Sequence, residues 1–237
     1  MWIIAMIGHI AAGMVALTAF WSAALLRKGS KAHRRAGRIF LLAMVAILAS
    51  IPLIAAALLM QGEYLQVVRL PYVMLIASTA VWVAWRAIRD RQEPARFTGR
   101  VFRLLAFAMI ASGLVFFGIG VRVDNFMTIG FALVGLVFGG AMLAFALRGP
   151  ASPRWWLGWH INGVCLLFAA THDSFLSLGL RSLLPQLQGE SMRYLIFYSV
   201  LGLAIAARIW LGWKYLAPAR SGRLENQSFS SVATRSA

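Results

Sequence analysis

The sequence predicts an all-α bundle of seven transmembrane helices, with the N-terminus outside the cytoplasm and the C-terminus inside it. Of the 237 residues, 61% are hydrophobic and only 13% are charged, whereas soluble domains average about 45–50% and about 25%. The apolar residues gather in seven stretches, each near the roughly 20 residues that a helix needs to cross the bilayer hydrocarbon. Lysine and arginine gather in alternate loops between these stretches.

The predicted spans follow one another with short polar or basic connections. Each must be helical, because lipid offers no partners to exposed backbone N–H and C=O groups. The first span lacks the positive start of a signal peptide and exceeds its usual apolar core of about 7–15 residues, so we expect it to be retained. Pro52 predicts a kink in the second span, and Pro153 lies near the first turn of the sixth, where a missing N–H costs little. The spans are 2–26, 38–60, 70–88, 101–121, 126–147, 155–180 and 194–216.

The domain organisation is correspondingly simple. Residues 1–216 are expected to form one transmembrane domain, because no polar stretch is long enough to fold by itself. Residues 217–237 are polar and rich in serine, which predicts a disordered cytoplasmic tail.

The distribution of lysine and arginine sets the predicted orientation. The odd-numbered loops and the C-terminal end hold 18 of these residues, and the even-numbered loops hold 4. Loops rich in Lys and Arg stay in the cytoplasm, so the odd loops are expected there. The net charge of +16 then reflects this orientation and an attraction to anionic lipid at the cytoplasmic face. Nucleic-acid binding is not expected, because no folded basic module is present to carry it.

Polar side chains are rare inside the predicted spans, and bilayer hydrocarbon penalises them, so each is a candidate for function. A single cysteine, Cys165, excludes an internal disulfide and is expected to be a packing residue. The polar candidates are His9, His160, Asn162, His172, Asp173 and Arg208.

Two of the histidines lie at matched depth. His9 and His172 are each eight residues from the outer end of their spans, which places both about 12 Å below the surface. Two imidazoles at equal depth on different helices match the bis-histidine ligation of a b-type haem, with the iron as the shared metal. We therefore predict that His9 and His172 face each other as outer ligands. The alternative is that each imidazole hydrogen-bonds a backbone carbonyl or a neighbouring helix.

His33 and His160 form a second, less well matched pair on the inner side. His33 is expected to be shallower than His160 by about 8 Å, and a solvated or phosphate-binding His33 is the simpler alternative. His160 and His172 are about 18 Å apart in height on one helix, so they cannot share one ion. Arg208 lies about 12 Å from the inner end of its span. We predict that it points into the bundle, toward Asn162, His160 or an anionic group such as a haem propionate, and not that it snorkels to the interface.

Three functions remain open. The first is a haem-binding protein of transmembrane electron transfer, with His9, His172, His33, His160 and Arg208 as cofactor-binding residues. The second is a transporter or small-molecule-binding protein with a polar path through His172, Asp173 and Arg208, in which Asp173 orients an imidazole, relays protons or faces water. The third is a non-catalytic subunit of a membrane complex or a homo-oligomer. ATPase and hydrolase functions are not supported, because the sequence contains no Walker loop, no His-Glu-x-x-His and no Gly-x-Ser-x-Gly motif.

The first 40 residues contain two further motifs, His9-Ile10-Ala11-Ala12-Gly13 and Lys28-Gly29-Ser30-Lys31-Ala32-His33-Arg34-Arg35-Ala36-Gly37. In these, the chain resembles a large bacterial family of multi-pass membrane proteins catalogued as a domain of unknown function. The resemblance implies a bacterial inner membrane and functional positions at His9, Lys28, Gly29, His33, Arg34 and Gly37. Family members often carry a later His-Arg run, where this chain reads Ala95-Arg96-Phe97. The layout is also similar, more distantly, to b-type cytochromes that carry electrons across membranes on paired histidines.

Overall fold

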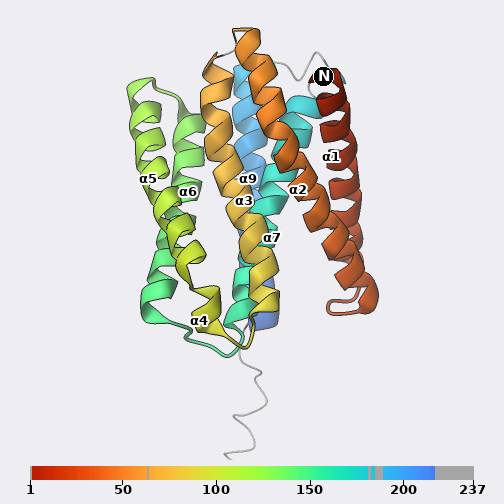
Figure 1. The fold of residues 1–237 in the computed structure, drawn as a ribbon, viewed down its shortest axis with the longest axis vertical. Coiled ribbons are helices and arrows are strands. Elements are labelled where there is room, and N and C mark those ends of the chain that lie inside the picture. Colours follow the sequence, from red (N-terminus) through yellow and green to blue (C-terminus); the bar gives the residue numbers. More distant parts are fainter. Residues whose placement is uncertain (1, 63, 181–182, 185–188, 217–237) are drawn as a thin grey trace, which may run out of the picture.

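The computed structural model describes residues 2–62, 64–180, 183–184 and 189–216, and within these ranges it contains helices and no strands. Seven long helices stand side by side and alternate in direction (Figure 1). They are α1 (Trp2–Leu25), α2 (Lys31–Met60), α3 (Tyr64–Arg89), α5 (Arg100–Arg122), α6 (Phe126–Arg148), α7 (Trp155–Ser174) and α9 (Glu190–Leu216). A short α4 (Pro94–Phe97) precedes α5, and a π-helical segment, η1 (Phe175–Leu180), continues α7. The all-α prediction is confirmed.

Six of the long helices, all except α7, are long and apolar enough to cross a membrane. Their outward faces carry large apolar side chains with high exposure, such as Leu25 at 82%, Val137 at 71% and Trp213 at 75%. A water-soluble protein does not expose so continuous an apolar surface, whereas lipid covers it without penalty. The protein is therefore an integral membrane protein.

Helix α7, the sixth of the long helices, differs from the prediction of seven equivalent spans. Residues 155–180, predicted as one span, form α7 followed by η1, and α7 does not qualify as apolar enough. The reason is that its 20 residues include several polar side chains, His160, Asn162, His172 and Asp173. The structure thus contains six apolar candidate spans and one polar central helix.

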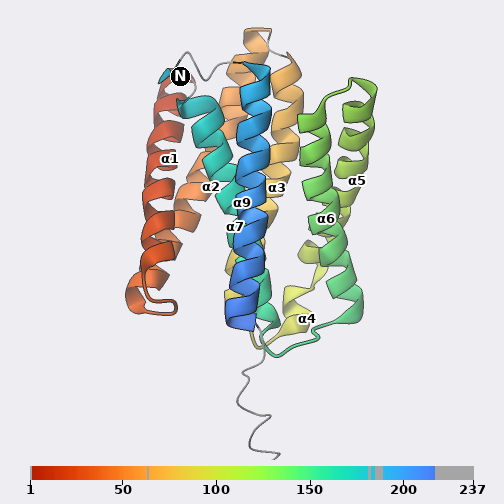
Figure 2. The ribbon, with the colours of Figure 1, turned by 180° about the vertical axis from the view of Figure 1, so that it is seen from behind.

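The helices form two lateral hairpins around a central group. The hairpin of α1 and α2 lies on one side, the hairpin of α5 and α6 on the other, and α3, α7 and α9 lie between them (Figures 1 and 2). Helix α7 packs mainly against α3 and α9, and it also contacts α1. Helix α7 therefore contacts three other long helices, as does α3.

Close contact between α3 and α7 depends on Gly163. A Cβ atom at this position would lie 2.8 Å from the carbonyl oxygen of Ala80 and 2.9 Å from the Cβ of Ala84. Small residues on facing helices allow such close approach in membranes, where dispersion and interhelical hydrogen bonds drive association. Gly202 on α9 has no atom within 4 Å of the corresponding position.

Several helices begin earlier than the apolar stretches that predicted them. Helix α2 begins at Lys31 instead of residue 38, because the Ser30 hydroxyl accepts a hydrogen bond of 3.1 Å from the backbone N–H of His33 and caps the helix. Helix α3 begins at Tyr64 instead of residue 70 and contains Pro71. Hydropathy marks the depth of the hydrocarbon, whereas caps mark the helix ends. Pro52 lies inside α2, and the predicted tail, 217–237, lies outside the described residues.

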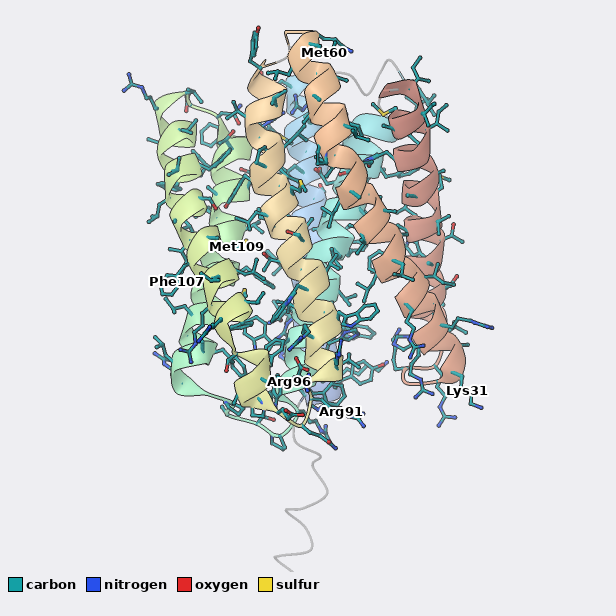
Figure 3. All side chains as sticks on the ribbon, viewed as in Figure 1. Lys31, Met60, Arg91, Arg96, Phe107 and Met109 are labelled. Atoms are coloured by element: carbon teal, nitrogen blue, oxygen red, sulfur yellow. The ribbon has the colours of Figure 1, made fainter. Side chains whose placement is uncertain are left out.

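The connections 26–30, 90–99 and 149–154 lie at one end of the bundle, together with the C-terminal end of α9 (Figure 1). We call this end the basic end. Figure 3 shows Lys31, Arg91 and Arg96 there and Met60 at the opposite end. The basic loops, which alternate with less basic loops along the sequence, therefore lie together at one end of the bundle.

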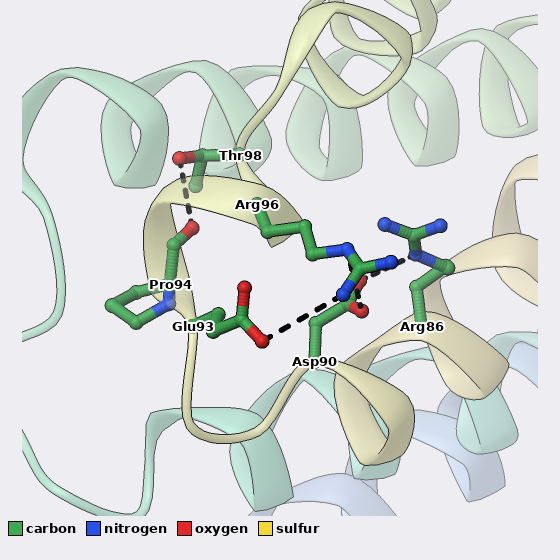
Figure 4. A network of polar contacts seen from close by, with 6 residues as sticks. All are labelled: Arg86, Asp90, Glu93, Pro94, Arg96 and Thr98. Carbon is green, nitrogen blue, oxygen red and sulfur yellow. Dashed lines mark hydrogen bonds and ion pairs between the residues drawn. The ribbon is translucent and has the colours of Figure 1, made fainter.

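A buried carboxylate organises part of the basic end. Asp90 is 2% exposed, and its Oδ2 accepts a hydrogen bond of 2.5 Å from Arg86 Nε. Arg96 reaches back from α4, with Nε 3.8 Å from Asp90 Oδ1 and Nη1 3.6 Å from Glu93 Oε1 (Figure 4). These ion pairs hold α4 against the bundle, where Phe97 is fully buried. Phe97 packs in an aromatic cluster with Trp82, Phe102, Phe145, Trp155 and Trp159.

We predict that Gly163→Ala lowers stability by about 1–3 kcal/mol, the usual result of overpacking a close contact. The added methyl group meets backbone atoms of α3, which cannot rotate away. Thermal unfolding of the purified protein in detergent measures the change. Gly202→Ala is the matched control and is expected to be neutral or slightly stabilising, since alanine is the better helix former. Equal melting temperatures of the two variants would contradict the prediction.

Candidate binding site around the central helix

All four histidines hold Nδ1 in a hydrogen bond. The partner is the carbonyl oxygen of Ala23 for His33 (2.9 Å), of Ala84 for His160 (3.0 Å) and of Phe168 for His172 (2.9 Å). A carbonyl only accepts, so Nδ1 is the donor in each of these bonds. In the neutral imidazole, Nε2 then carries the free lone pair.

His9 has the same arrangement through a hydroxyl group. Its Nδ1 lies 2.8 Å from Ser50 Oγ on α2. Ser50 donates its single proton to the carbonyl oxygen of Ile47 at 2.6 Å, so the hydroxyl accepts from His9. His9 and His172 therefore make the bonds to a neighbouring helix or a backbone carbonyl that were the alternative to ligation.

The lone pair of His172 is already occupied. Trp21 Nε1 on α1 donates to His172 Nε2 at 3.1 Å, and the imidazole lies among aromatic rings with centroid distances of 5.5 Å to Phe20, 5.7 Å to Trp21 and 4.1 Å to Phe168. The two hydrogen bonds and the ring contacts join α7 to α1. This arrangement leaves no nitrogen of His172 for a metal.

The prediction that His9 and His172 face each other is wrong. His172 contacts Trp21, which follows His9 by twelve residues on α1, a rise of about 18 Å. The predicted depth of each histidine was measured from the outer end of its apolar span, and it holds only if the two spans end at the same height in the membrane. The aromatic contacts instead place His172 beside the last turns of α1, and His9 beside Ser50 of α2.

His33 and His160 come closer to the predicted arrangement. His33 is the third residue of α2 and His160 is the sixth residue of α7, and both helices begin at the basic end of the bundle. Among the described residues, neither Nε2 atom has a hydrogen-bond partner. Two imidazoles with free lone pairs are therefore held in one region of the bundle, toward its basic end.

The prediction that Arg208 points into the bundle is confirmed. Its Nε donates a hydrogen bond to Asn162 Oδ1 on α7, and the residue is half-buried. The guanidinium lies along α9 over Gly212, where a Cβ atom would be 2.7 Å from Nη1. Gly212 thus leaves space for a charged group at membrane depth.

Asp173 has a local partner. Ser177 donates to its Oδ1 at 3.1 Å, four residues further along the chain. His172, Asp173 and Arg208 consequently have separate partners, and Asn162 precedes His172 by ten residues, about 15 Å along α7. A small cavity lies elsewhere, between α3, α5 and α6, and has room for about one water molecule. It is lined by Arg69, Tyr72, Val73, Phe116, Thr128 and Phe131.

Within the described ranges, no group of three or more His, Cys, Asp or Glu side chains is placed to hold a metal ion. Cys165 is buried and free. A closed site of four protein ligands is therefore not formed by these residues. Two-imidazole ligation of a cofactor that supplies its own remaining ligands does not need such a group.

Two polar contacts in the structure were not predicted from the sequence. Trp21 is the hydrogen-bond partner of His172, and the spacing of Phe168 four residues before His172 was a usable signal for part of the aromatic cluster. Asp90 was overlooked among the arginines of its loop, although Arg86 precedes it by four residues on the same helix face.

Comparison with known proteins gave no match: no family model, no curated protein and no solved structure is significantly similar to this chain. The assignment of function accordingly depends on the residues and their geometry.

We predict that Arg208→Leu lowers the melting temperature in detergent, because it removes the partner of Asn162 inside the bundle. Interhelical hydrogen bonds in membranes contribute about 1–2 kcal/mol or less. Arg122→Leu is the control, since Arg122 is an exposed arginine at the end of α5. If Arg208 served only as a snorkelling anchor, its leucine variant would be as stable as the wild type or more stable.

Proposed function

We propose that this integral membrane protein binds haem b between α2 and α7, with His33 and His160 as axial ligands, and that it takes part in membrane electron transfer. The state of the two imidazoles carries the proposal. Each donates Nδ1–H to a backbone carbonyl, from Ala23 or Ala84, and keeps Nε2 free. Histidines that bind metals are held in this way, because the second hydrogen bond fixes the ring and raises the basicity of the ligating nitrogen.

Helix α7 also holds a cation at a depth close to that of His160. Asn162 follows His160 by two residues, on a different face of the helix, and it accepts a hydrogen bond from the Arg208 guanidinium. Arginine has five N–H donors and cannot lose its charge, so donors remain for a carboxylate such as a haem propionate.

When bound, a bis-histidine haem supplies a one-electron redox couple. The role of the protein is to hold the two imidazoles in one tautomer, to pair the propionate with the Arg208 guanidinium and to exclude water. His9 and His172 are not included in this proposal, because they are apart and because Trp21 occupies Nε2 of His172. The transport hypothesis gains no comparable support, since His172, Asp173 and Arg208 each have separate partners.

The haem proposal predicts a reduced-minus-oxidised b-type spectrum for the protein purified from membranes of haem-sufficient cells. His33→Ala and His160→Ala are each expected to abolish the spectrum, because haem would lose an axial ligand. His9→Ala and His172→Ala are matched controls that remove an imidazole elsewhere, and they are expected to keep it. Comparable amounts of inserted protein must be confirmed for each variant. A wild-type protein without haem absorbance, or a spectrum that survives both inner substitutions, would contradict the proposal.

We also infer that the basic end faces the cytoplasm of a bacterial inner membrane. The inference is supported by the excess of Lys and Arg in the loops at that end, and by the direction of α9, whose C-terminal end lies there. The N-terminus then lies outside. Reporter fusions after position 217 should be active only with cytoplasmic reporters, and fusions in 123–125 only with periplasmic ones. The opposite pattern would reverse the orientation.

A further inference from the structure

The carbonyl oxygen of Ala23 accepts two side-chain hydrogen bonds near the C-terminal end of α1. His33 Nδ1 lies 2.9 Å from this oxygen, and Lys28 Nζ lies 3.0 Å from it. A carbonyl oxygen has two lone pairs, so it can accept from both donors at once. The imidazole of His33 therefore shares its acceptor with an ammonium group.

The short turn between α1 and α2 creates this arrangement. The last carbonyl groups of a helix have no intrahelical partner, and Lys28 also donates to the carbonyl oxygen of Ala24 at 2.5 Å, where the helix dipole favours a cation. Gly29 follows with a φ of 78°, a conformation that glycine adopts without steric cost. Ser30 then caps α2 by accepting from the backbone N–H of His33. The two side chains thus reach the same carbonyl from the two ends of one turn.

Backbone hydrogen bonds hold this turn independently of the lysine side chain. The N–H of Leu26 donates to the carbonyl oxygen of Ser22 at 3.1 Å, and the N–H of Ser30 donates to that of Arg27 at 3.1 Å. Lys28 is exposed, so water can replace its bonds to the carbonyl oxygens. Its main effect is therefore on the charge at the end of α1, and the path of the chain does not depend on it.

The ammonium group acts on the imidazole in two ways. Because each nitrogen lies within 3.0 Å of one oxygen, Lys28 Nζ and His33 Nδ1 are at most about 6 Å apart, a range at which charges interact in proteins. The positive charge opposes any gain of positive charge on the imidazole or on a metal bound to it. The ammonium also competes for the lone pairs of the Ala23 oxygen, so the hydrogen bond from Nδ1 adds less basicity to Nε2.

His160 has no such neighbour. Its Nδ1 donates at 3.0 Å to the carbonyl oxygen of Ala84, a fully buried residue of α3. Within the part of the chain that the structure describes, no cationic side chain donates to that oxygen. The two imidazoles hold the same tautomer, but only the one on α2 is bonded to an acceptor that a cation shares.

We propose that Lys28 is a positioning residue that acts on His33 through the carbonyl of Ala23 and raises the redox potential of a metal bound at His33. The effect on the potential rests on the haem function proposed above, whereas the effect on the imidazole does not. The charge and the shared acceptor both favour the reduced metal, which carries one positive charge less. Removal of the ammonium is thus expected to lower the potential and to strengthen the hydrogen bond of Nδ1.

Lys28→Met tests the proposal, because it keeps a side chain of similar length and removes the charge. In the full chain with isotope-labelled histidine, purified in detergent, nuclear magnetic resonance should show the His33 Nδ1 proton shifted downfield, the sign of a stronger hydrogen bond. His33→Ala assigns this resonance. In redox titration of the haem-loaded protein, the equilibrium constant for reduction should fall roughly threefold to tenfold, at most about 59 mV for one electron. Lys28→Arg keeps the charge and the donors, so it should stay near the wild type in both measurements.

Lys31→Met is the matched control, because it removes the same charge from an exposed position on the first turn of α2. It should leave the Nδ1 proton unchanged and shift the potential less than Lys28→Met. Equal shifts in the two variants would show diffuse surface charge and overturn the proposal. An unchanged or upfield Nδ1 proton in Lys28→Met would overturn it as well, because the lysine would then only cap α1. A wild-type protein without haem would refute the haem function and the effect on the potential, while the Nδ1 proton would still decide whether Lys28 acts on His33.

Discussion

Polar side chains of α7 must find partners inside the protein, and this constraint organises the bundle. Hydrocarbon offers no hydrogen bonds, so His160, Asn162 and His172 are paired with three different helices: α3 through Ala84, α9 through Arg208 and α1 through Trp21. Each bond fixes the rotation of α7 as well as its neighbours. Gly163 then allows the backbones of α7 and α3 to approach closely. Residues 155–173 of α7 are consequently all buried or half-buried, with α3, α9 and α1 as the neighbouring helices.

The sequence was sufficient for the features that depend on composition. Apolar stretches gave the long helices, and the alternation of basic loops matches the two ends of the bundle. Helix ends were less predictable, because Ser30 extends α2 beyond the apolar stretch by capping it. The polar character of α7 was visible in its residues, but it was treated as a span like the others. Its polar side chains find partners on neighbouring helices, and α7 is not among the helices that are apolar enough to cross a membrane by themselves.

The candidate site was predicted only in part. The contact of Arg208 with Asn162 could be anticipated, since both lie at similar depth and a guanidinium must find acceptors. The pairing of His9 with His172 could not be judged from depth alone, because the relative height of two helices depends on tertiary packing. The aromatic contacts of Phe20 and Trp21 with His172 determine that height. The hydrogen bonds of the histidines also became visible only with the helices in place. Each Nδ1 is bonded, and the bond from Trp21 to Nε2 distinguishes His172 from His33 and His160.

The polarity of α7 has a consequence for how the protein is made. During synthesis, a segment enters the membrane largely according to its own hydrophobicity, and polar side chains such as His160 and Asn162 oppose the entry of α7. Helix α7 is a poor candidate for entry by itself, but α1 and α3, which bind its histidines, have been synthesised before it. Helix α9, which supplies the partner of Asn162, follows later. We therefore expect α7 to enter the membrane against helices that are already in place, and α9 to complete the bundle afterwards.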